Sequence, residues 1–281
     1  MFFNHKTSTE KNVSKKDTIQ IIDIRMQRPI IARIEEENLN LTLQMSDKAT
    51  LSGATVSFFT PNNVSIFLSS AKKELSKSNS IYKSLFGKIH KTKHKNFKIS
   101  DKDLPRLYNY FESIQTAIIS MYTAIESFAN ICIPHDYVYE KNNAKGIKES
   151  YSKELIERYI PTSEKIDKIL PSILNCDSPK GSKLWQDFKS LESLRNDIIH
   201  PKTTKKNTET KEDSSFLCIL LSDDFIKKVS CGFDLVSYFC KQDTTHSLFP
   251  MGFGEIELKP VPIKAGDFEK VDDHDEIELP S

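Results

Sequence analysis

The sequence SDKDLPRLYNYFESIQTAIISMYTAIESFANICIP, residues 100–134, decides the fold class because it predicts one long helix. Its apolar side chains follow one another at intervals of three and four residues, which places them on one face of a helix. A helix-start signature at 100–103, a proline tolerated in the first turn (Pro105) and Pro134 at the end bound about eight turns. The apolar positions are Leu104, Leu107, Phe111, Ile114, Ile118, Met121, Ile125, Phe128 and Cys132.

A second helix is predicted for LWQDFKSLESLRNDII, residues 184–199. Arg195 lies near the middle of its apolar face, where a charge costs several kcal/mol unless it is paired. The helix is expected to end at His200, because Pro201 disfavours helical geometry at the residue before it. Asn196, four residues before His200, shares its side of the helix. The apolar face comprises Leu184, Trp185, Phe188, Leu191, Leu194, Ile198 and Ile199.

A polar line runs beside the apolar seam of the first helix, since Tyr122, Glu126 and Asn130 are spaced four residues apart. A carboxylate in this line is a natural partner for Arg195 on a facing helix. Two interpretations of such a pair remain open. In one, Glu126 orients Arg195 beneath a phosphate; in the other, the two form an interhelix ion pair that fixes the register of the helices. Glu126 and Asn130 are therefore candidates for a supporting role.

The stretch Arg195-Asn196-Asp197-Ile198-Ile199-His200 resembles the R-N-x3-H motif of HEPN domains, the higher eukaryotes and prokaryotes nucleotide-binding fold. The segment MYTAIESFAN, residues 121–130, is similar to the first long helix of that bundle. The resemblance covers residues 101–243, about half of the chain. It implies an antiparallel helical bundle and a metal-independent endoribonuclease with paired motifs, as in toxins and defence effectors that cut RNA.

The residue types of the motif suit RNA cleavage without a metal. Such cleavage needs a base for the 2′-hydroxyl, an acid for the leaving oxygen and a cation for the phosphorane charge. His200 suits either proton role, Arg195 suits the phosphate charge, and Asn196 is assigned to orient His200 or to bind a phosphate oxygen. Because one chain supplies one such histidine, the chemistry favours a homodimer through the helical bundle, with two motifs meeting at a two-fold axis.

The expected partners are an RNA substrate, a second copy of the chain and an antitoxin or defence-complex protein, with no cofactor and no metal. The alternative is a non-catalytic HEPN-like module for dimerisation or for binding RNA or nucleotides. In that case the helix dipole favours His200, Arg195 is a structural ion pair, and Asn196 is an end-of-helix hydrogen-bonding residue.

Composition narrows the class of protein. The formal net charge of +1 argues against a large positive field for holding nucleic acid, although it is compatible with a local basic groove. Five cysteines without a CxxC pair suit reduced thiols in a cytoplasm. The longest apolar run, residues 216–221, is far shorter than the ~20 residues that cross a bilayer. We therefore expect a cytoplasmic protein without a membrane partner.

The N-terminal third has a different pattern. Three short β-branched, aromatic or alternating runs at 17–25, 38–45 and 54–60 predict a small antiparallel sheet, and residues 64–85 then follow a helical pattern. Two groups of lysines are weak candidates for RNA contacts, with solvated lysines of connecting segments as the alternative. These are Lys91, Lys93 and Lys95, and, next to the motif, Lys202, Lys205 and Lys206.

The remaining patterns complete the organisation. They predict a polar loop at 136–151, shorter helices at 151–160 and 163–174 that end at prolines, a buried run at 216–221 and a last helix through Cys240. Prolines near the C-terminal end exclude a central strand there.

The predicted fold class is mostly α: an HEPN-like antiparallel helical bundle with a small N-terminal β-rich (α+β) region and an extended C-terminal segment. The parts are a flexible tail at 1–16, the β-rich region at 17–99, the bundle at 100–243 and the extended segment with an acidic tail at 244–281. That acidic tail is expected to be disordered, with a polyanion mimic over a basic surface as the alternative.

Overall fold

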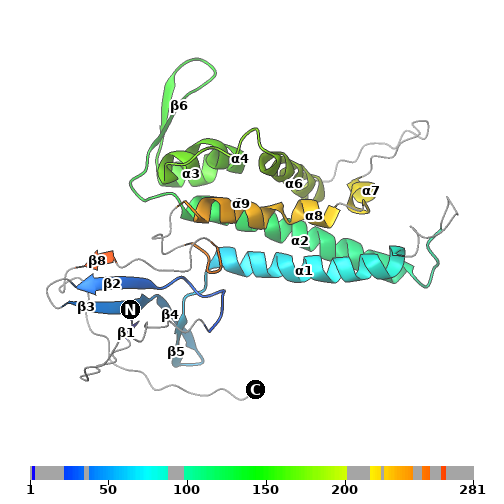
Figure 1. The fold of residues 1–281 in the computed structure, drawn as a ribbon, viewed down its shortest axis with the longest axis horizontal. Coiled ribbons are helices and arrows are strands. Elements are labelled where there is room, and N and C mark those ends of the chain that lie inside the picture. The colour runs from blue at the N-terminus through cyan, green and yellow to red at the C-terminus, as the bar shows by residue number, and fades with distance from the viewer. Residues whose placement is uncertain are drawn as a thin grey trace.

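A computed structural model describes residues 2–3, 22–34, 38–87, 98–200, 216–222, 225–242, 249–253 and 261–263. The molecule is mostly helical, with small, mainly antiparallel β-sheets gathered at one end and one further β-hairpin beside the short helices (Figure 1). The expected class, mostly α with a small β-rich region, is therefore confirmed.

Two long helices, α1 (Asn63–Phe86) and α2 (Leu104–Ile131), lie side by side along the length of the molecule (Figure 1). Asn62 caps α1, because its side chain accepts a hydrogen bond of 3.0 Å from the amide of Ser65. Helix α2 begins directly after Asp103, with Pro105 in the first turn, as the sequence predicted, although the Asp103 side chain makes no capping hydrogen bond. Both helices predicted from periodicity are confirmed.

The main hydrophobic core lies between α1, α2 and the helices that cover them. Full burial of one Leu, Ile or Phe side chain contributes about 1.5–3 kcal/mol, so this seam is a large part of the fold's stability. Its members from α1 and α2 include Val64, Leu68, Ala71, Leu75, Ile114, Ile118, Met121, Ile125 and Phe128. Because α1 belongs to this core, the helical part of the structure begins at Asn63. The sequence predicted a bundle that starts at residue 100.

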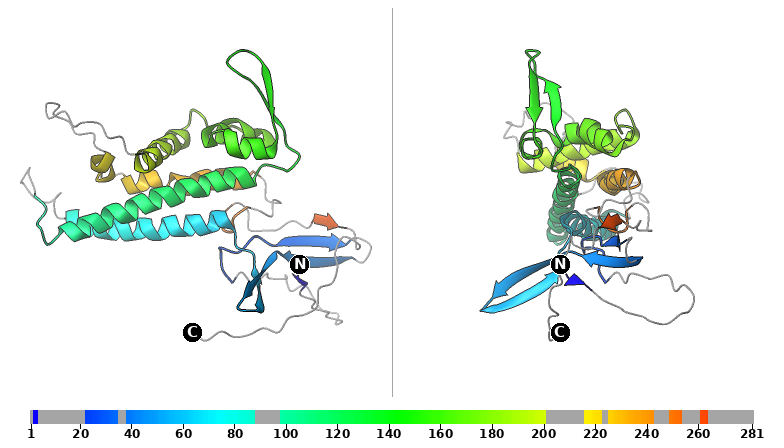
Figure 2. Two further views of the ribbon diagram at one scale, coloured as in Figure 1. Left: turned by 180° about the vertical axis from the view of Figure 1, so that it is seen from behind. Right: turned by 90° about the vertical axis from the view of Figure 1, so that its left-hand side faces the viewer.

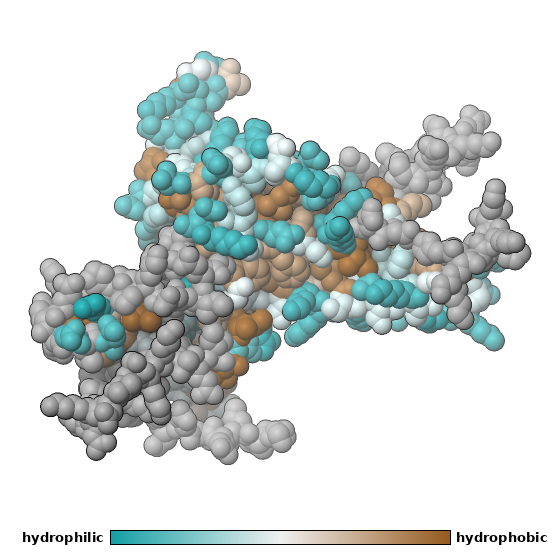
Figure 3. Space-filling view, in the orientation of Figure 1, coloured by the Kyte–Doolittle hydropathy of each residue, from teal (hydrophilic) through white to brown (hydrophobic). Residues whose placement is uncertain are grey.

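Three further helices cover α2: α6 (Lys183–Ile199), α8 (Phe225–Val229) and α9 (Cys231–Cys240). Helix α9 approaches α2 closely at Gly232, where an added Cβ atom would lie 2.3 Å from Sδ of Met121. In the space-filling view, hydrophobic residues lie between the helical tiers and hydrophilic residues cover their outer faces (Figure 3).

The predicted apolar faces need two corrections. On α6, Phe188, Leu191 and Leu194 are buried, but Ile199 is 41% exposed because it lies at the helix end, beyond the covering helices. The predicted buried run at 216–221 is instead the short helix α7 (Phe216–Leu220), in which only Leu220 is buried. Successive side chains of a helix point in different directions around its axis, so only part of a short helix faces the core.

A group of short helices packs beside the end of α2. These are α3 (Lys153–Tyr159), α4 (Thr162–Glu164), the π-helical turn η2 (Lys165–Ile169) and α5 (Leu170–Leu174). Their core consists of Ile133, Ile156, Ile160 and Ile169. The predicted helices are confirmed, but the second continues past Pro171, because this proline occupies the first turn of α5, where no amide donor is needed.

Residues 136–151, predicted as a polar loop, contain a β-hairpin of β6 (Tyr139–Asn142) and β7 (Lys148–Tyr151). The hairpin projects away from the helices (Figure 2). Gly146 has φ +74° in its turn, a conformation that favours glycine. The loop prediction was wrong because both strands are polar, so their alternation carries no hydrophobic signal.

The β-rich end contains a four-stranded sheet in the order β1-β3-β2-β8 and a separate hairpin of β4 and β5. The strands are β1 (Phe2–Phe3), β2 (Ile30–Ile34), β3 (Leu39–Gln44), β4 (Ser46–Leu51), β5 (Ala54–Phe59) and β8 (Val261–Ile263). The strands predicted at 38–45 and 54–60 are confirmed. Of the run 17–25, residues 22–25 are described and form a turn rather than a strand. The short strand β8, which contains Pro262, pairs at the sheet edge, as prolines require.

Candidate functional site

The end of α6 holds the three residues of the motif. Arg195 and Asn196 lie in the last two turns, and His200 is the C-cap, with φ −121° and ψ 66°. The amide of His200 still donates to the carbonyl of Asn196 at 2.8 Å. The predicted helix end is therefore confirmed, and both the imidazole and Asn196 are exposed at it.

The guanidinium of Arg195 rests on an aromatic ring. Its Cζ lies 5.0 Å from the centroid of the Tyr122 ring, and its Nη1 donates to Oδ1 of Asn196 at 3.1 Å. Arg195 is half-buried rather than enclosed in the core. It makes no ion pair with any carboxylate in the described part of the chain. The positive charge is thus held in place and left available to an anion.

Tyr122 itself is fixed on several sides. Its side chain is 6% exposed, its ring lies parallel to that of Phe188 with centroids 6.3 Å apart, and its Oη donates to Oε1 of Glu192 at 3.2 Å. Burial is the main reason that the pKa of Tyr122 is raised, to about 12, and the nearby carboxylate of Glu192 adds to the effect.

Glu192 lies three residues before Arg195, a spacing at which side chains are neighbours on a helix surface. Its carboxylate is bonded by Tyr122 and by the amine of Lys189. Sequence reasoning missed this role of Glu192, although its spacing from Arg195 was a usable signal.

The predicted pairing of Arg195 with Glu126 does not occur among the described residues. Glu126 lies close enough to Lys165 to favour the charged form of that amine, and Asn130 Oδ1 accepts a hydrogen bond of 2.7 Å from Lys165 Nζ. The reason is that η2 brings a second cation against this part of α2. The polar line of α2 therefore divides, with Tyr122 facing Arg195 and the other two residues serving Lys165.

Lys165 is a buried cation that was not predicted from the sequence. It is 1% exposed, and its Nζ also donates to the carbonyl oxygen of Glu157 at 3.1 Å. Burial lowers the pKa of this amine, while the carboxylates of Glu126 and Glu157 act against that shift. Its position four residues before buried Ile169 was the available signal.

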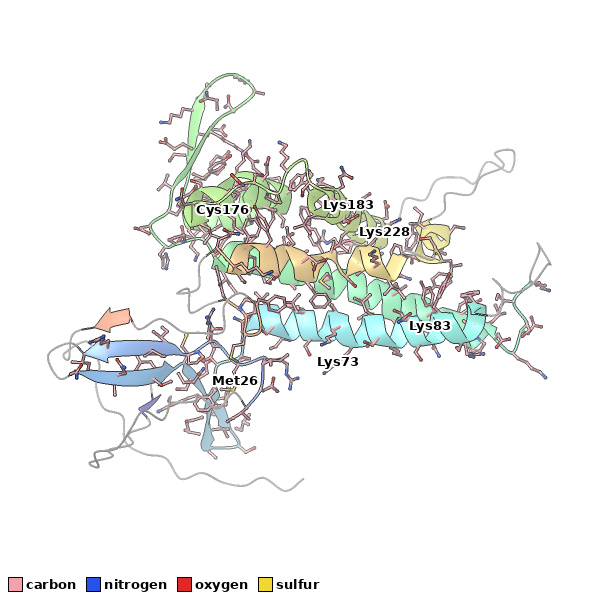
Figure 4. All side chains as sticks on the ribbon, viewed as in Figure 1. Met26, Lys73, Lys83, Cys176, Lys183 and Lys228 are labelled. Atoms are coloured by element: carbon pink, nitrogen blue, oxygen red, sulfur yellow. The ribbon has the colours of Figure 1, made fainter. Side chains whose placement is uncertain are left out.

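The six candidate lysines, Lys91, Lys93, Lys95, Lys202, Lys205 and Lys206, lie outside the described residues. Among those labelled in Figure 4, Lys183 and Lys228 lie near α6 and α8, whereas Lys73 and Lys83 lie along α1 on the other side of the helical layer. These described lysines are spread over the surface rather than gathered in one groove.

Two surface hollows lie away from the motif. One is lined by Tyr137, Tyr139 and Lys168, among others, and the second by Cys176, Asp177 and Tyr238 with neighbouring residues. Neither includes the end of α6. The motif is therefore not part of these hollows and lies at the exposed end of its helix.

The family comparison bears on this half of the chain. Residues 108–228 match the family model described as the YopA C-terminal domain. The match runs from α2 to α8, covers less than half of the chain and includes the motif at the end of α6. No curated protein and no solved structure matches the chain. Within the described residues, no helix is both long enough and apolar enough to span a bilayer.

Proposed function

We propose that this chain is a metal-independent endoribonuclease of HEPN type, which cuts RNA at a site shared by two protomers. The observation that carries the proposal is the state of Arg195. Arg195 is half-buried, its guanidinium is oriented by a ring and an amide, and it pairs with no described carboxylate, five residues before an exposed histidine. A structural ion pair would instead neutralise the charge of Arg195.

The proposed reaction is an attack of the 2′-oxygen of a ribose on the adjacent phosphorus. One His200 takes the proton of the 2′-hydroxyl, and the same histidine of the second protomer gives a proton to the leaving 5′-oxygen. The new bond closes a 2′,3′-cyclic phosphate and the bond from phosphorus to the 5′-oxygen breaks. Arg195 binds the charge that builds on the phosphorane, with Asn196 as a second hydrogen-bonding group.

The open position of the motif supports a shared site. A single protomer supplies one motif histidine at an exposed helix end, and a second α6 end facing it across a two-fold axis would complete the set and exclude water. Exposed Ile199, next to His200, provides apolar surface for such a contact. All five cysteines are free thiols, which supports a reducing, cytoplasmic environment. The HEPN resemblance adds the role of toxin or defence effector, with an antitoxin or defence-complex partner.

The test is RNA cleavage in excess EDTA by the full chain and by the Arg195→Ala and His200→Ala variants. We expect structured RNAs to be cut to products with 2′,3′-cyclic phosphate ends, and each variant to lose at least about a hundredfold in rate. Arg158→Ala is the matched control, because Arg158 also lies over a tyrosine ring, that of Tyr159, away from the motif. Equal cutting by all four proteins would show a contaminating nuclease.

A second candidate is a non-catalytic HEPN-like module that binds RNA or dimerises. A nuclease needs a cleft at Arg195, whereas a binding module does not. The two surface hollows favour the module because neither includes the motif. RNA that is bound but never cut, with binding weakened by Arg195→Ala, would establish this function in place of the nuclease.

A further inference from the structure

We infer that Tyr122 is the positioning residue of this site: its ring holds the guanidinium of Arg195 in the orientation in which it meets a phosphate. The inference rests on the proposed function for the identity of the anion. The geometry itself is independent of it, with Cζ of Arg195 5.0 Å from the ring centroid. The face of an aromatic ring carries partial negative charge and attracts a cation at this distance.

The ring is a rigid support. Tyr122 comes from the middle of α2, and its side chain is buried. Phe188 lies parallel to it with an interplanar angle of 3°, and Glu192 holds its hydroxyl. Glu192 is held in turn by Lys189. The platform under Arg195 is therefore fixed from two helices at once.

The ring orients Arg195 without neutralising its charge, whereas a carboxylate would neutralise it. The ring restricts a long side chain with several rotatable bonds, but it forms no charge-neutralising ion pair. Of the five N–H donors of the guanidinium, one is used by Asn196 Oδ1. Neighbouring Glu192, which would otherwise compete at a spacing of three residues, is engaged by Tyr122 and Lys189. The result is a prearranged cation for a phosphate oxygen pair.

The first test reads the contact in the free protein, by NMR of the arginine side-chain Nε–Hε groups in the full chain. We expect the aromatic ring current to shift the signal of Arg195, the shift to remain in Tyr122→Phe, and to vanish in Tyr122→Leu. Tyr159→Leu is the matched control, since it removes the exposed ring that lies 5.3 Å from Cζ of Arg158, and it should change the signal of Arg158 while leaving that of Arg195 unchanged. An Arg195 signal that is unchanged in Tyr122→Leu would overturn the inference, whatever the protein does to RNA.

The second test asks whether Tyr122 acts through Arg195. The probe is a 20-nucleotide single-stranded DNA, which lacks the 2′-hydroxyl, and its binding is followed by fluorescence anisotropy. We expect Tyr122→Leu to weaken binding about tenfold, Tyr122→Phe to weaken it less because it keeps the ring, and Tyr122→Leu to have no further effect in an Arg195→Ala background. An equal loss in both backgrounds would show a general structural role and overturn the inference.

These two tests separate the inference from the proposed function. If the DNA does not bind and RNA is not cut, the proposed function fails, and the NMR signal of Arg195 alone decides whether Tyr122 positions it. If RNA is cut but Tyr122→Leu cuts at the wild-type rate while remaining folded, the nuclease stands and the positioning role falls.

Discussion

Lys165 is a cation with almost no access to water, and its environment is asymmetric. Two neutral oxygens, from the side chain of Asn130 and the backbone of Glu157, accept its hydrogen bonds, while the carboxylates of Glu126 and Glu157 act on it only through space. Removing a buried charge from water is expensive unless it is fully paired. The hydrogen bonds of Lys165 nevertheless tie η2 to Asn130 of α2 and to Glu157 of α3.

The titration of Lys165 gives a pH prediction. Its pKa in the folded protein is lowered from the ordinary value of 10.5, so the unfolded chain holds this proton to higher pH. The free energy of unfolding attributable to Lys165 therefore rises with pH between the lowered pKa and 10.5, by up to about 1.4 kcal/mol per pH unit. We expect this rise in urea denaturation of wild type and its absence in Lys165→Met. The control Lys168→Met, at an exposed amine, should keep the wild-type slope.

At the scale of single residues, the sequence identified the motif but not its surroundings. Periodicity placed Arg195 on an apolar face, and Pro201 placed the helix end at His200. The partner of Arg195 was predicted from charge alone, as Glu126. Which residue faces Arg195 depends on the rotation and height of two packed helices, and the π-helical turn η2 brings Lys165 to Glu126 instead. Neither quantity is encoded in local spacing.

At the scale of elements, one carboxylate ties the β6–β7 hairpin to the short helices. Glu164 of α4 accepts a hydrogen bond of 2.9 Å from Tyr139 Oη and one of 3.1 Å from Lys141 Nζ. Burial alone would raise the pKa of Glu164, but these two bonds hold it below its usual value. A two-stranded hairpin is at best marginally stable by itself, so this anchor, together with the packing of Tyr139 and Tyr151 against the isoleucine cluster, holds it in position.

We expect Glu164→Ala to lower the free energy of local opening of the hairpin by about 1–3 kcal/mol, measured by hydrogen exchange of the amides of β6 and β7. Because the pKa of Glu164 is lowered, the same stabilisation should fade as pH falls through that pKa. Glu140→Ala is the matched control, since Glu140 forms an exposed ion pair with Lys148 in the same hairpin. Equal loss of protection in both variants would contradict the anchoring role.

The elements were predictable where burial imposed a pattern and were missed where it did not. Helices α1, α2 and α6 each bury one face, so their periods are visible in the sequence. The strands of the hairpin at 139–151 are polar, and the sequence of β2 (Ile30–Ile34) shows no clear alternation of apolar and polar residues. A helix was predicted at 163–174, close to the observed run from Thr162 to Leu174, but the change of hydrogen bonding inside it was not, because propensity does not distinguish α from π turns.

At the scale of the whole molecule, the proposed shared site makes Ile199 a test of assembly. This side chain is 41% exposed and adjacent to His200, so a contact between two α6 ends would cover it. We expect Ile199→Glu to halve the mass measured by light scattering and to abolish RNA cleavage, with a melting temperature close to that of wild type. Leu155→Glu is the control, because Leu155 is also 41% exposed but lies on α3. A dimer that survives Ile199→Glu with full activity would contradict a site built from two α6 ends.

The π-helical turn η2 has a consequence for the length of the chain around it. The amide of Leu170 donates to the carbonyl of Lys165, five positions back rather than four. Deleting one residue from this turn would give an uninterrupted α-helix, but it would swing everything before it by about 100° relative to everything after it. The shortened chain could keep either the hydrogen bond of Lys165 to Asn130 or the buried position of Ile169, but not both. In this segment the number of residues is as strict a requirement as their identity. A one-residue deletion or insertion would be tolerated less well than many substitutions.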